Sequence, residues 1–450
     1  MAILWAKQAL LAYGWAQDVR IDIGPDGRIK AVASGQSGPG CDVLLPAPAN
    51  LHSHAFQRAM AGMTERRGPD PADSFWTWRQ LMYRFLDRLT PDHIRVITAF
   101  VQMEMLEAGY TCTVEFHYLH HRPGGAPYDQ LAEMAQQIAA AAELTGIGLT
   151  LLPVQYQFGG CDRRALGPGQ IRFGTNPDQF ARLHAASREA LLGLPADTIL
   201  GVAPHSLRAV APGMLADLAG LGGPVHMHLA EQHAEVAEVR AAYGARPVEW
   251  LLDNADVDER WCLIHCTQMD PPETVALART GAVAGLCPIT ESNLGDGIFD
   301  GMRWQAAGGR FGIGSDSNIR IGLTEELRLL EHTQRLRDGS RAAFATADKS
   351  TGRMLFEAAA QGSAQAAGRG RGVIAVGEWA DLLALDGSHI DLDGRQGDDL
   401  LDAYIFAGND RMVSDVWSAG RHLVTQGRHI RHDQIKAAYR AALRDLRGQM

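Results

Sequence analysis

Residue types that bind metal ions occur at four points along the chain, each close to the end of an apolar run. In chain order they are His52 and His54, His228 and Glu231, His265, and Asp316. Three imidazoles and one carboxylate can hold a divalent cation and leave room for a water molecule. His265 and Glu231 would then be free to move the protons of that water, so the pattern predicts metal-assisted hydrolysis.

The His-x-His pair is weak evidence when it stands alone. Chance supplies about 0.6 such pairs in a chain with this histidine content, and a second pair, His226 and His228, is indeed present. The order of the motifs carries more weight: His-x-His early, His-x-x-Glu in the middle, a lone histidine, and Gly-Ser-Asp near the end of the same segment. This combination predicts a metal site.

Each of the other residues also has a purely structural explanation. His228 could be a core histidine, and Glu231 could open a helix, where its charge suits the dipole. His265 could be a buried histidine with its hydrogen bonds made, and Asp316 could stabilise a turn. We favour function because imidazole suits a general base near neutral pH and because catalytic residues of β/α barrels follow strand ends.

Strands and helices alternate across residues 47–365. Strands are expected before the four motifs, at Val43–Pro46, Val225–Met227, Cys262–Ile264 and Phe311–Gly314, and helices at Asp92–Ala108, Tyr128–Thr145, Asp178–Leu192 and Pro271–Thr280. This rhythm indicates parallel β/α units. Leu51-His-Ser-His stands where an open doubly wound sheet would carry its glycine-rich phosphate motif. We therefore predict an α/β fold with a closed (β/α)8 TIM-type barrel as the catalytic domain.

Both ends of the chain are rich in short apolar segments and turns. Strands are predicted at Val19–Ile23 and Ile29–Val32, which form a hairpin, and at Gly372–Gly377, Ala380–Leu385, Met412–Trp417 and His422–Thr425. Period-2 alternation around Pro-Asp-Gly is typical of a hairpin. Residues 1–46 and 366–450 are therefore expected to form one small β-sandwich domain, followed by a C-terminal helix.

Composition excludes several classes of protein. The net charge is −10 and the pI about 5.9, which argues against a nucleic-acid or anionic membrane surface. The six cysteines contain no C-x-x-C pair. Cys262 and Cys266 would lie about 13 Å apart along a strand, so we expect them to pack rather than share an ion. Neither a secretory signal nor a run of 20 apolar residues is evident, and a reducing cytoplasm is the expected location.

Several stretches of sequence resemble a known family. The run Pro46-Ala-Pro-Ala-Asn-Leu-His-Ser-His54, the His-x-x-Glu, the lone histidine and the Gly-Ser-Asp resemble the amidohydrolase superfamily. Four segments are similar to its formimidoylglutamate deiminase family: Asn50–Gly62, Asp73–Arg79, Glu115–His121 and His205–Val210. The similarity runs from roughly residue 1 to 430.

The resemblance implies one Zn²⁺ per subunit, held by His52, His54, His228 and Asp316, although iron or manganese also suits such ligands. It implies hydrolysis of N-formimino-L-glutamate to N-formyl-L-glutamate and ammonia, a step of histidine degradation. The resemblance further implies that a zinc-activated water would attack the formimino carbon and that His265 would take its proton. Asp316 would relay a proton so that ammonia leaves, and Glu231 would hydrogen-bond the amidine nitrogen. A homodimer is compatible with the family.

The glutamate part of this substrate carries two carboxylates, which arginine forks suit. The resemblance assigns substrate binding to Gln57, Arg79, Tyr118, His205 and Arg208. Arg79 could instead stack on its neighbouring tryptophans, and Arg208 could brace its own loop. Two such arginines beside the site of an acidic protein favour a small anionic substrate.

Two rival functions remain open. A purine deaminase of the same superfamily, acting on guanine or adenosine, would lean on aromatic stacking rather than on two arginines. A barrel that serves only as a scaffold would show gaps in the ligand set.

Many relatives have a histidine where this chain has Gln268. We interpret His117, His120 and His121 as loop or supporting residues rather than a second metal site.

Overall fold

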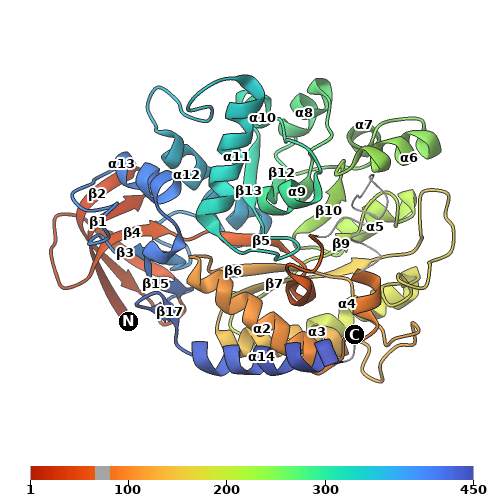
Figure 1. The fold of residues 1–450 in the computed structure, drawn as a ribbon. Helices are drawn as coiled ribbons and strands as arrows, with labels where there is room; N and C mark the ends of the chain where they lie inside the picture. The colour runs from red at the N-terminus through yellow and green to blue at the C-terminus, as the bar shows by residue number, and fades with distance from the viewer. Residues whose placement is uncertain (1, 66–81, 449–450) are drawn as a thin grey trace.

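The computed structural model describes residues 2–65 and 82–448. Two regions can be followed in Figure 1. One is a β-rich region that contains the first strands of the chain together with its last ones. The other is a larger region in which strands and helices alternate.

In the described part of the larger region, nine short strands form two parallel sheets. One sheet contains β5 (Ala49–Ser53), β6 (Cys112–His117), β7 (Gly148–Gln155), β8 (Ile199–Leu200) and β9 (Ala203–Pro204). The other contains β10 (Val225–Leu229), β11 (Trp261–His265), β12 (Val283–Leu286) and β13 (Arg310–Ile313). Isolated parallel bridges join the two sheets at both sides, between Val202 and Val225 and between Ser53 and Asp316.

Helices alternate with these strands along the chain. They are η1 (Ala55–Met60), α2 (Pro91–Glu107), α3 (Glu133–Thr145), α4 (Pro177–Ala190), η2 (Pro212–Met214), α5 (Leu215–Ala219), α6 (His233–Tyr243), α7 (Pro247–Asn254), α8 (Pro271–Ala278), α9 (Pro288–Leu294), α10 (Gly301–Ala306), α11 (Leu323–Asp338) and α12 (Thr351–Ala366). The starts of α2, α4 and α8 share one device: a Thr, Asn or Asp cap followed by proline. Such a cap stabilises a helix by about 1 kcal/mol.

All four predicted helices are present, but the predicted start of one of them is wrong by several residues. The helix predicted from Tyr128 begins only at Glu133. Tyr128 instead lies in the preceding loop, where the guanidinium of Arg122 stacks 5.2 Å from its ring centroid. A tertiary contact of this kind leaves no trace in the periodicity of the sequence.

The two ends of the chain share one eight-stranded sheet. Its strand order is β17 (Arg428–His429), β16 (Arg421–Thr425), β15 (Val413–Ser418), β14 (Leu382–Leu385), β4 (Cys41–Pro46), β1 (Ala2–Leu11), β2 (Gly14–Ile23) and β3 (Ile29–Ala33). The predicted hairpin is present as β2 and β3. Strands from both ends of the chain therefore lie in one sheet; that residues 1–46 and 366–450 form one domain stays a prediction.

Two strand predictions need correction. Val43–Pro46 is a strand, but it lies in the eight-stranded sheet between β14 and β1, and the strand that carries His52 is β5. The segment Gly372–Gly377 is not a strand; it contributes only an isolated bridge from Ile374 to Leu11. Both of its terminal glycines have positive φ, 64° and 89°, a conformation that turns the chain out of an extended path.

A buried ion cluster links the β-rich region to the larger one. The carboxylate of Asp197 accepts hydrogen bonds from Arg369 at 2.9 Å and from Arg421 at 2.8 and 2.7 Å. Arg369 also donates to Asp381, twice at 2.8 Å. These four residues come from the loop before β8, the loop after α12, the position just before β14, and β16, so the cluster fixes the two regions against each other.

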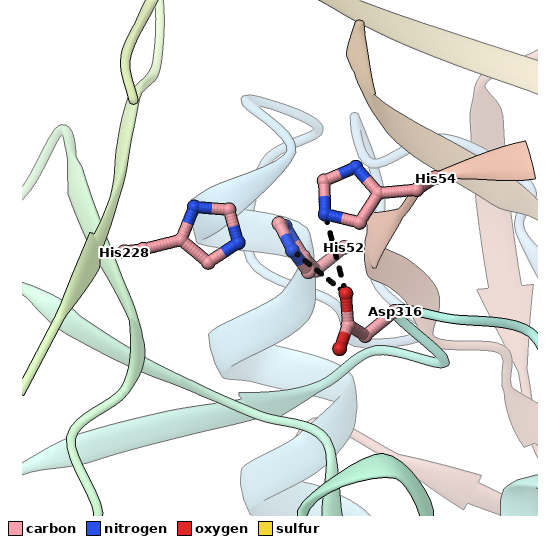
Figure 2. Close-up of side chains that lie close together, drawn as sticks. All are labelled: His52, His54, His228 and Asp316. Atoms are coloured by element: carbon pink, nitrogen blue, oxygen red, sulfur yellow. Dashed lines mark ion pairs between the residues drawn. The ribbon is translucent and has the colours of Figure 1, made fainter. Parts of the chain in front are cut away.

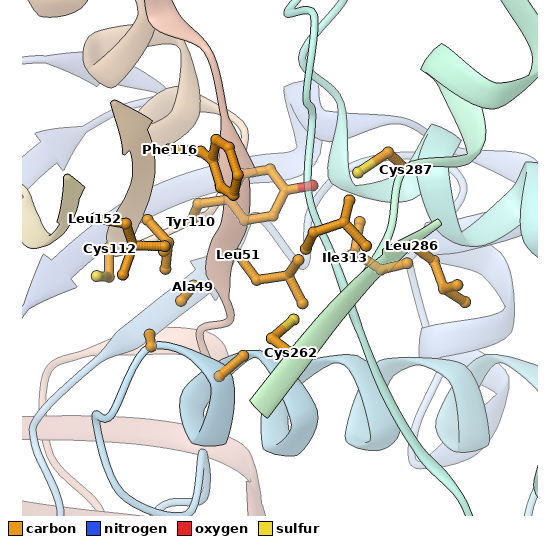
Figure 3. Packing of buried hydrophobic residues seen from close by; sticks show 14 of the residues in the cluster. Ala49, Leu51, Tyr110, Cys112, Phe116, Leu152, Cys262, Leu286, Cys287 and Ile313 are labelled. Carbon is orange, nitrogen blue, oxygen red and sulfur yellow. The ribbon is translucent and has the colours of Figure 1, made fainter. Parts of the chain in front are cut away.

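The main core lies around the parallel strands. Figure 3 shows Leu51 of β5 packed among side chains of β6, β12 and β13. Cys262 and Cys287 lie in the same cluster as unpaired, fully buried thiols. Cys266 is also fully buried in this cluster, which agrees with the predicted role of Cys262 and Cys266 in packing.

The C-terminal helix α14 (His432–Gly448) lies along α2 and α3 (Figure 1). Ile435 packs with Ala99, Met103 and Ala141, and the ring of Tyr439 stacks on that of Phe100 at 3.9 Å. Between β14 and β15 the chain forms α13 (Asp398–Asp402), η3 (Ala403–Ala407) and η4 (Asp410–Met412). Within the described ranges, the helices are either too short or too polar for a membrane span.

Candidate active site

Four buried side chains form one cluster with the composition of a metal site. His52 comes from β5, His54 directly follows that strand, His228 comes from β10 and Asp316 from the turn after β13, and Figure 2 shows them facing one another. One candidate ligand atom from each lies within 4.8 Å of the others. The nearer carboxylate oxygen of Asp316 lies 3.4 Å from His52 Nε2 and 3.2 Å from His54 Nε2.

Backbone hydrogen bonds hold this cluster in place. His52, near the end of β5, and His54, the first residue after it, are two residues apart, a spacing that directs side chains to the same side. The Asp316 amide donates to the carbonyl of His52 at 2.9 Å, and the His54 amide donates to the carbonyl of Asp316 at 2.9 Å. Asp316 itself has a left-handed backbone, with φ of 42°. Non-glycine residues adopt this conformation where the surrounding structure imposes it, often at functional sites.

Two of the imidazoles are oriented by main-chain carbonyls. The Nδ1 of His54 bonds to the carbonyl of Phe116 at 3.1 Å, and the Nδ1 of His228 bonds to the carbonyl of His205 at 3.2 Å. Because a carbonyl only accepts, each Nδ1 carries the proton and each Nε2 keeps its lone pair. This is the tautomer that a metal ligand requires.

Burial keeps the histidines neutral. It lowers the pKa of His52 to about 3 and lowers that of His54 as well. Burial, together with the neighbouring imidazoles, holds the pKa of His228 well below its usual value. For Asp316, burial alone would raise the pKa, but the facing imidazoles of His52 and His54 hold it below its usual range. The cluster therefore presents neutral imidazoles and an ionised carboxylate, which are the states that bind cations.

His265 and Glu231 lie beside the cluster. His265 Nε2 is 3.8 Å from a Glu231 oxygen, and its Nδ1 is 3.2 Å from a Glu291 oxygen. Burial alone would lower the pKa of His265, but the carboxylates of Glu231, Glu291 and Asp316 hold it well above its usual value. These carboxylates favour the imidazolium that forms when His265 accepts a proton. The predicted proton-transfer pair is thus brought together.

A cleft of about 550 Å³, including its open mouth, leads to the cluster. Four residues predicted to bind substrate line it: Gln57, Tyr118, His205 and Arg208. Gln57 Nε2 donates to the hydroxyl of Tyr118 at 3.0 Å. Arg208 is only 8% exposed, and its Nε has no hydrogen-bond partner in residues 2–65 and 82–448. The fifth predicted residue, Arg79, lies outside the described residues.

Other wall residues were not foreseen from the sequence. They are Met82, Tyr156, Phe173 and Leu294. Each comes from a loop, a strand end or a short helix without a motif of its own. Glu291, which bonds to His265, was also missed; it is on α9, 26 residues further along the chain.

The remaining histidines that were singled out have structural partners. His226 Nε2 bonds to the carbonyl of Ala366 at 2.8 Å and takes no part in the cluster. His120 bonds to the carbonyl of Val154 at 3.0 Å, and His121 to that of Gly174 at 2.7 Å. Burial lowers the pKa of His117 to about 3. In the described part of the chain these three do not form a metal-binding group.

Comparison with known proteins identifies the family. The profile of the Amidohydrolase family matches residues 43–423, and that of the Formimidoylglutamate deiminase HutF N-terminal domain matches residues 1–44. A formimidoylglutamate deiminase of Pseudomonas aeruginosa is 47% identical, with 99% of this chain and 100% of the relative covered.

Solved structures agree with this assignment. An amidohydrolase from Brucella melitensis matches with a TM-score of 0.95 and 48% identity, covering 99% of this chain and 100% of the other. An adenosine deaminase from Xanthomonas campestris with bound zinc matches with a TM-score of 0.82 at 22% identity, covering 99% and 98% of the two chains, and supports the fold alone. The chain therefore belongs to the Amidohydrolase family, and within that family to the group that contains formimidoylglutamate deiminase.

Proposed function

We propose that this protein hydrolyses N-formimino-L-glutamate to N-formyl-L-glutamate and ammonia, as a step of histidine degradation. The observation that carries the proposal is the composition of one cleft. It joins the cluster of three histidines and an aspartate, the proton-transfer pair His265 and Glu231, and the buried guanidinium of Arg208. The amidine of the substrate suits the cluster and the proton-transfer pair, and its anionic tail suits the guanidinium of Arg208.

The donor set fits a single zinc ion. Neither ring nitrogen of His52 has a hydrogen-bond partner among the described residues, although both are buried. An unpartnered buried polar atom costs free energy unless a ligand satisfies it. Three imidazole nitrogens and one carboxylate oxygen suit zinc, with iron or manganese as chemical alternatives. When bound, zinc brings the pKa of a coordinated water close to neutrality and makes it a nucleophile.

The side chains around the cluster then handle the protons. His265 takes a proton from the attacking water through Nε2, the nitrogen nearer to Glu231. Glu231 hydrogen-bonds the nitrogen of the amidine; burial raises the pKa of this carboxyl, so it can also exist as a donor. Asp316, which contacts both His52 and His54, takes the second proton of the added water. This proton and the one held by His265 then pass to the departing nitrogen, so that ammonia leaves and the formyl group remains.

The opposite wall binds the glutamate part. The Nε of Arg208, which lacks a protein partner in the described ranges, offers a donor to a carboxylate. Gln57, Tyr118 and His205 add polar groups to the same wall. Arg79 is assigned to the second carboxylate on the resemblance alone. Arginine suits this role because its donors match both oxygens of a carboxylate.

We further propose the finer architecture. The parallel strands close into a (β/α)8 barrel over residues 47–365, which is supported by the isolated bridges at both sides of the two sheets. Residues 1–46 and 366–450 form the second domain as a β-sandwich, supported by a separate core that draws on β1, β2, β4 and β14.

The enzyme works in the cytoplasm, where its six unpaired cysteines stay reduced. Its partner is a small anionic substrate, neither nucleic acid nor membrane takes part, and a homodimer stays a prediction from the resemblance.

A direct assay tests the reaction. The zinc-loaded protein is incubated with N-formimino-L-glutamate, and ammonia release and the appearance of N-formyl-L-glutamate are measured together. Guanine and adenosine serve as rival substrates. We expect equal amounts of ammonia and N-formyl-L-glutamate from the formimino compound and none from the purines.

The outcomes separate the alternatives. Turnover of a purine without turnover of the formimino compound would keep the metal chemistry and refute the substrate. Inactivity of a fully metallated sample on all three compounds would support the scaffold. A neutral analogue, N-formimino-L-glutamine, keeps the amidine but loses one carboxylate, and we expect its KM to be much higher.

A further inference from the structure

The contacts of His265 on the side away from Glu231 carry a further inference. Glu291, on α9, is buried at 5% exposure. One of its oxygens lies 3.2 Å from His265 Nδ1 and also accepts the amide of Cys287 at 2.8 Å. The amide of Cys287 therefore fixes the position of that oxygen independently of its contact with His265.

We propose that Glu291 is a positioning residue for His265: its carboxylate accepts the Nδ1–H of the imidazole, fixes the ring, and directs Nε2 toward the substrate. This inference rests on the proposed function, in which His265 accepts a proton from water. The proton moves from the water to Nε2, the Nδ1 proton stays where it is, and the adjacent carboxylate stabilises the imidazolium. A carboxylate behind a catalytic histidine has this effect in other hydrolases.

The backbone of His265 makes such a partner necessary. Its φ is 74° and that of Cys266 is 54°. Both lie in the left-handed region, so the regular alternation of β11 ends here and does not set the direction of the imidazole. The hydrogen bond to Glu291 supplies the orientation that the strand geometry does not.

A second metal ion is the alternative explanation for this group of atoms. His265, Cys287 and Glu291 each offer an atom within 4.8 Å of the others. However, burial raises the pKa of the Cys287 thiol well above its usual value, and a protonated thiol is a poor ligand. The Glu291 oxygen already accepts two N–H donors, which is the environment of an acceptor rather than of a cation ligand.

Glu326 provides a matched control. It is fully buried on α11, and it also accepts an amide at the start of α9, that of Ile289 at 2.8 Å. Burial raises the pKa of Glu326 well above its usual value, so E326Q is close to neutral in shape and charge. Both carboxylates hold α9, but only Glu291 bonds to His265 in the described structure.

The test compares E291Q, E291L and E326Q in their zinc-loaded forms. Removing a carboxylate behind a functional histidine lowers activity by about 10- to 100-fold. We expect that loss in kcat for E291Q, a larger one for E291L, and KM within about twofold of wild type for both. E326Q should keep kcat within about twofold. If E291Q kept the kcat of E326Q, or if its loss were entirely in KM, the proposal would be wrong.

A readout independent of activity is the proton position on His265. Nitrogen-15 spectra of histidine-labelled protein report which ring nitrogen is protonated, and His265→Asn assigns the signal. We expect Nδ1 of His265 to be protonated in wild type and E326Q, and a proton no longer fixed on Nδ1 in E291L. The same pattern in E291L as in wild type would overturn the proposal even if the protein proved inactive on the formimino substrate. A second metal equivalent that E291Q loses would overturn it as well.

Discussion

Replacing Arg208 by methionine tests the substrate assignment most directly. The guanidinium is 8% exposed in a cleft of about 550 Å³, and its Nε has no partner within the described chain. Methionine keeps much of the volume and removes the charge. If a substrate carboxylate fills this position, the variant leaves that carboxylate buried without its counter-charge.

The expected loss of kcat/KM in R208M follows from the burial of the Arg208 guanidinium. Two unit charges about 4 Å apart interact by about 4 kcal/mol at an effective dielectric constant of about 20. Truncating one partner of a buried, hydrogen-bonded pair costs about 2–5 kcal/mol. Since each 1.4 kcal/mol is a factor of ten, kcat/KM should fall by about 30- to 5000-fold. The contact is made equally in the ground state and the transition state, so most of the loss should appear in KM.

Steady-state kinetics on three substrates isolate the contact. R208M and wild type are each assayed with N-formimino-L-glutamate and with the two monoamides that neutralise one carboxylate or the other. The loss should shrink for the monoamide whose missing charge was the partner of Arg208, which also assigns the carboxylate. R122M is the control, because it removes the same charge from an exposed pair with Asp129. Equal losses on all three substrates would mean that Arg208 only braces its loop.

Two further predictions concern the cluster and the ion network. H228A should lose most bound metal by plasma emission spectrometry, whereas H226A, which removes a buried histidine directed at Ala366, should keep it; equal contents would contradict the ligand assignment. D197N should lower the free energy of unfolding by about 3 kcal/mol at neutral pH. Burial by itself would raise the pKa of Asp197, but Arg421 and Arg369 lower it below 3.8. The stabilisation is thus present above that value and lost below it, so denaturation curves of D197N and wild type should converge below about pH 4; a constant difference would refute this.

The ligand cluster could be predicted because its residues follow local rules. His54 directly follows the strand that carries His52 and is two residues away from it, and His228 and Asp316 occur at or just beyond the ends of apolar runs. Parallel strands bring such ends to one side of the molecule. The prediction therefore needed only the periodicity and order of the motifs, not the contacts between helices.

The sequence could not predict features that depend on tertiary contacts. Glu291 reaches His265 only because α9 folds back over the end of β11, and nothing in its local sequence marks it. Val43–Pro46 has the apolar composition of a barrel strand, yet it pairs with β1 and β14. Composition shows that a strand is buried, but not which sheet buries it. The hydrophobic wall residues Met82 and Leu294 were missed for the same reason.

The position of the cluster gives the metal a second role. His52 belongs to the sheet of β5 and His54 directly follows that strand. His228 belongs to the sheet of β10, and Asp316 follows β13 of that same sheet. On this side the two sheets meet at the isolated bridge between Ser53 and Asp316. A cation held by all four side chains would cross-link the sheets at the point where regular strand pairing is sparse. Binding free energy that is absent from the unfolded chain becomes folding free energy, so the proposed ligand set would also stabilise the seam between the first and last parallel strands.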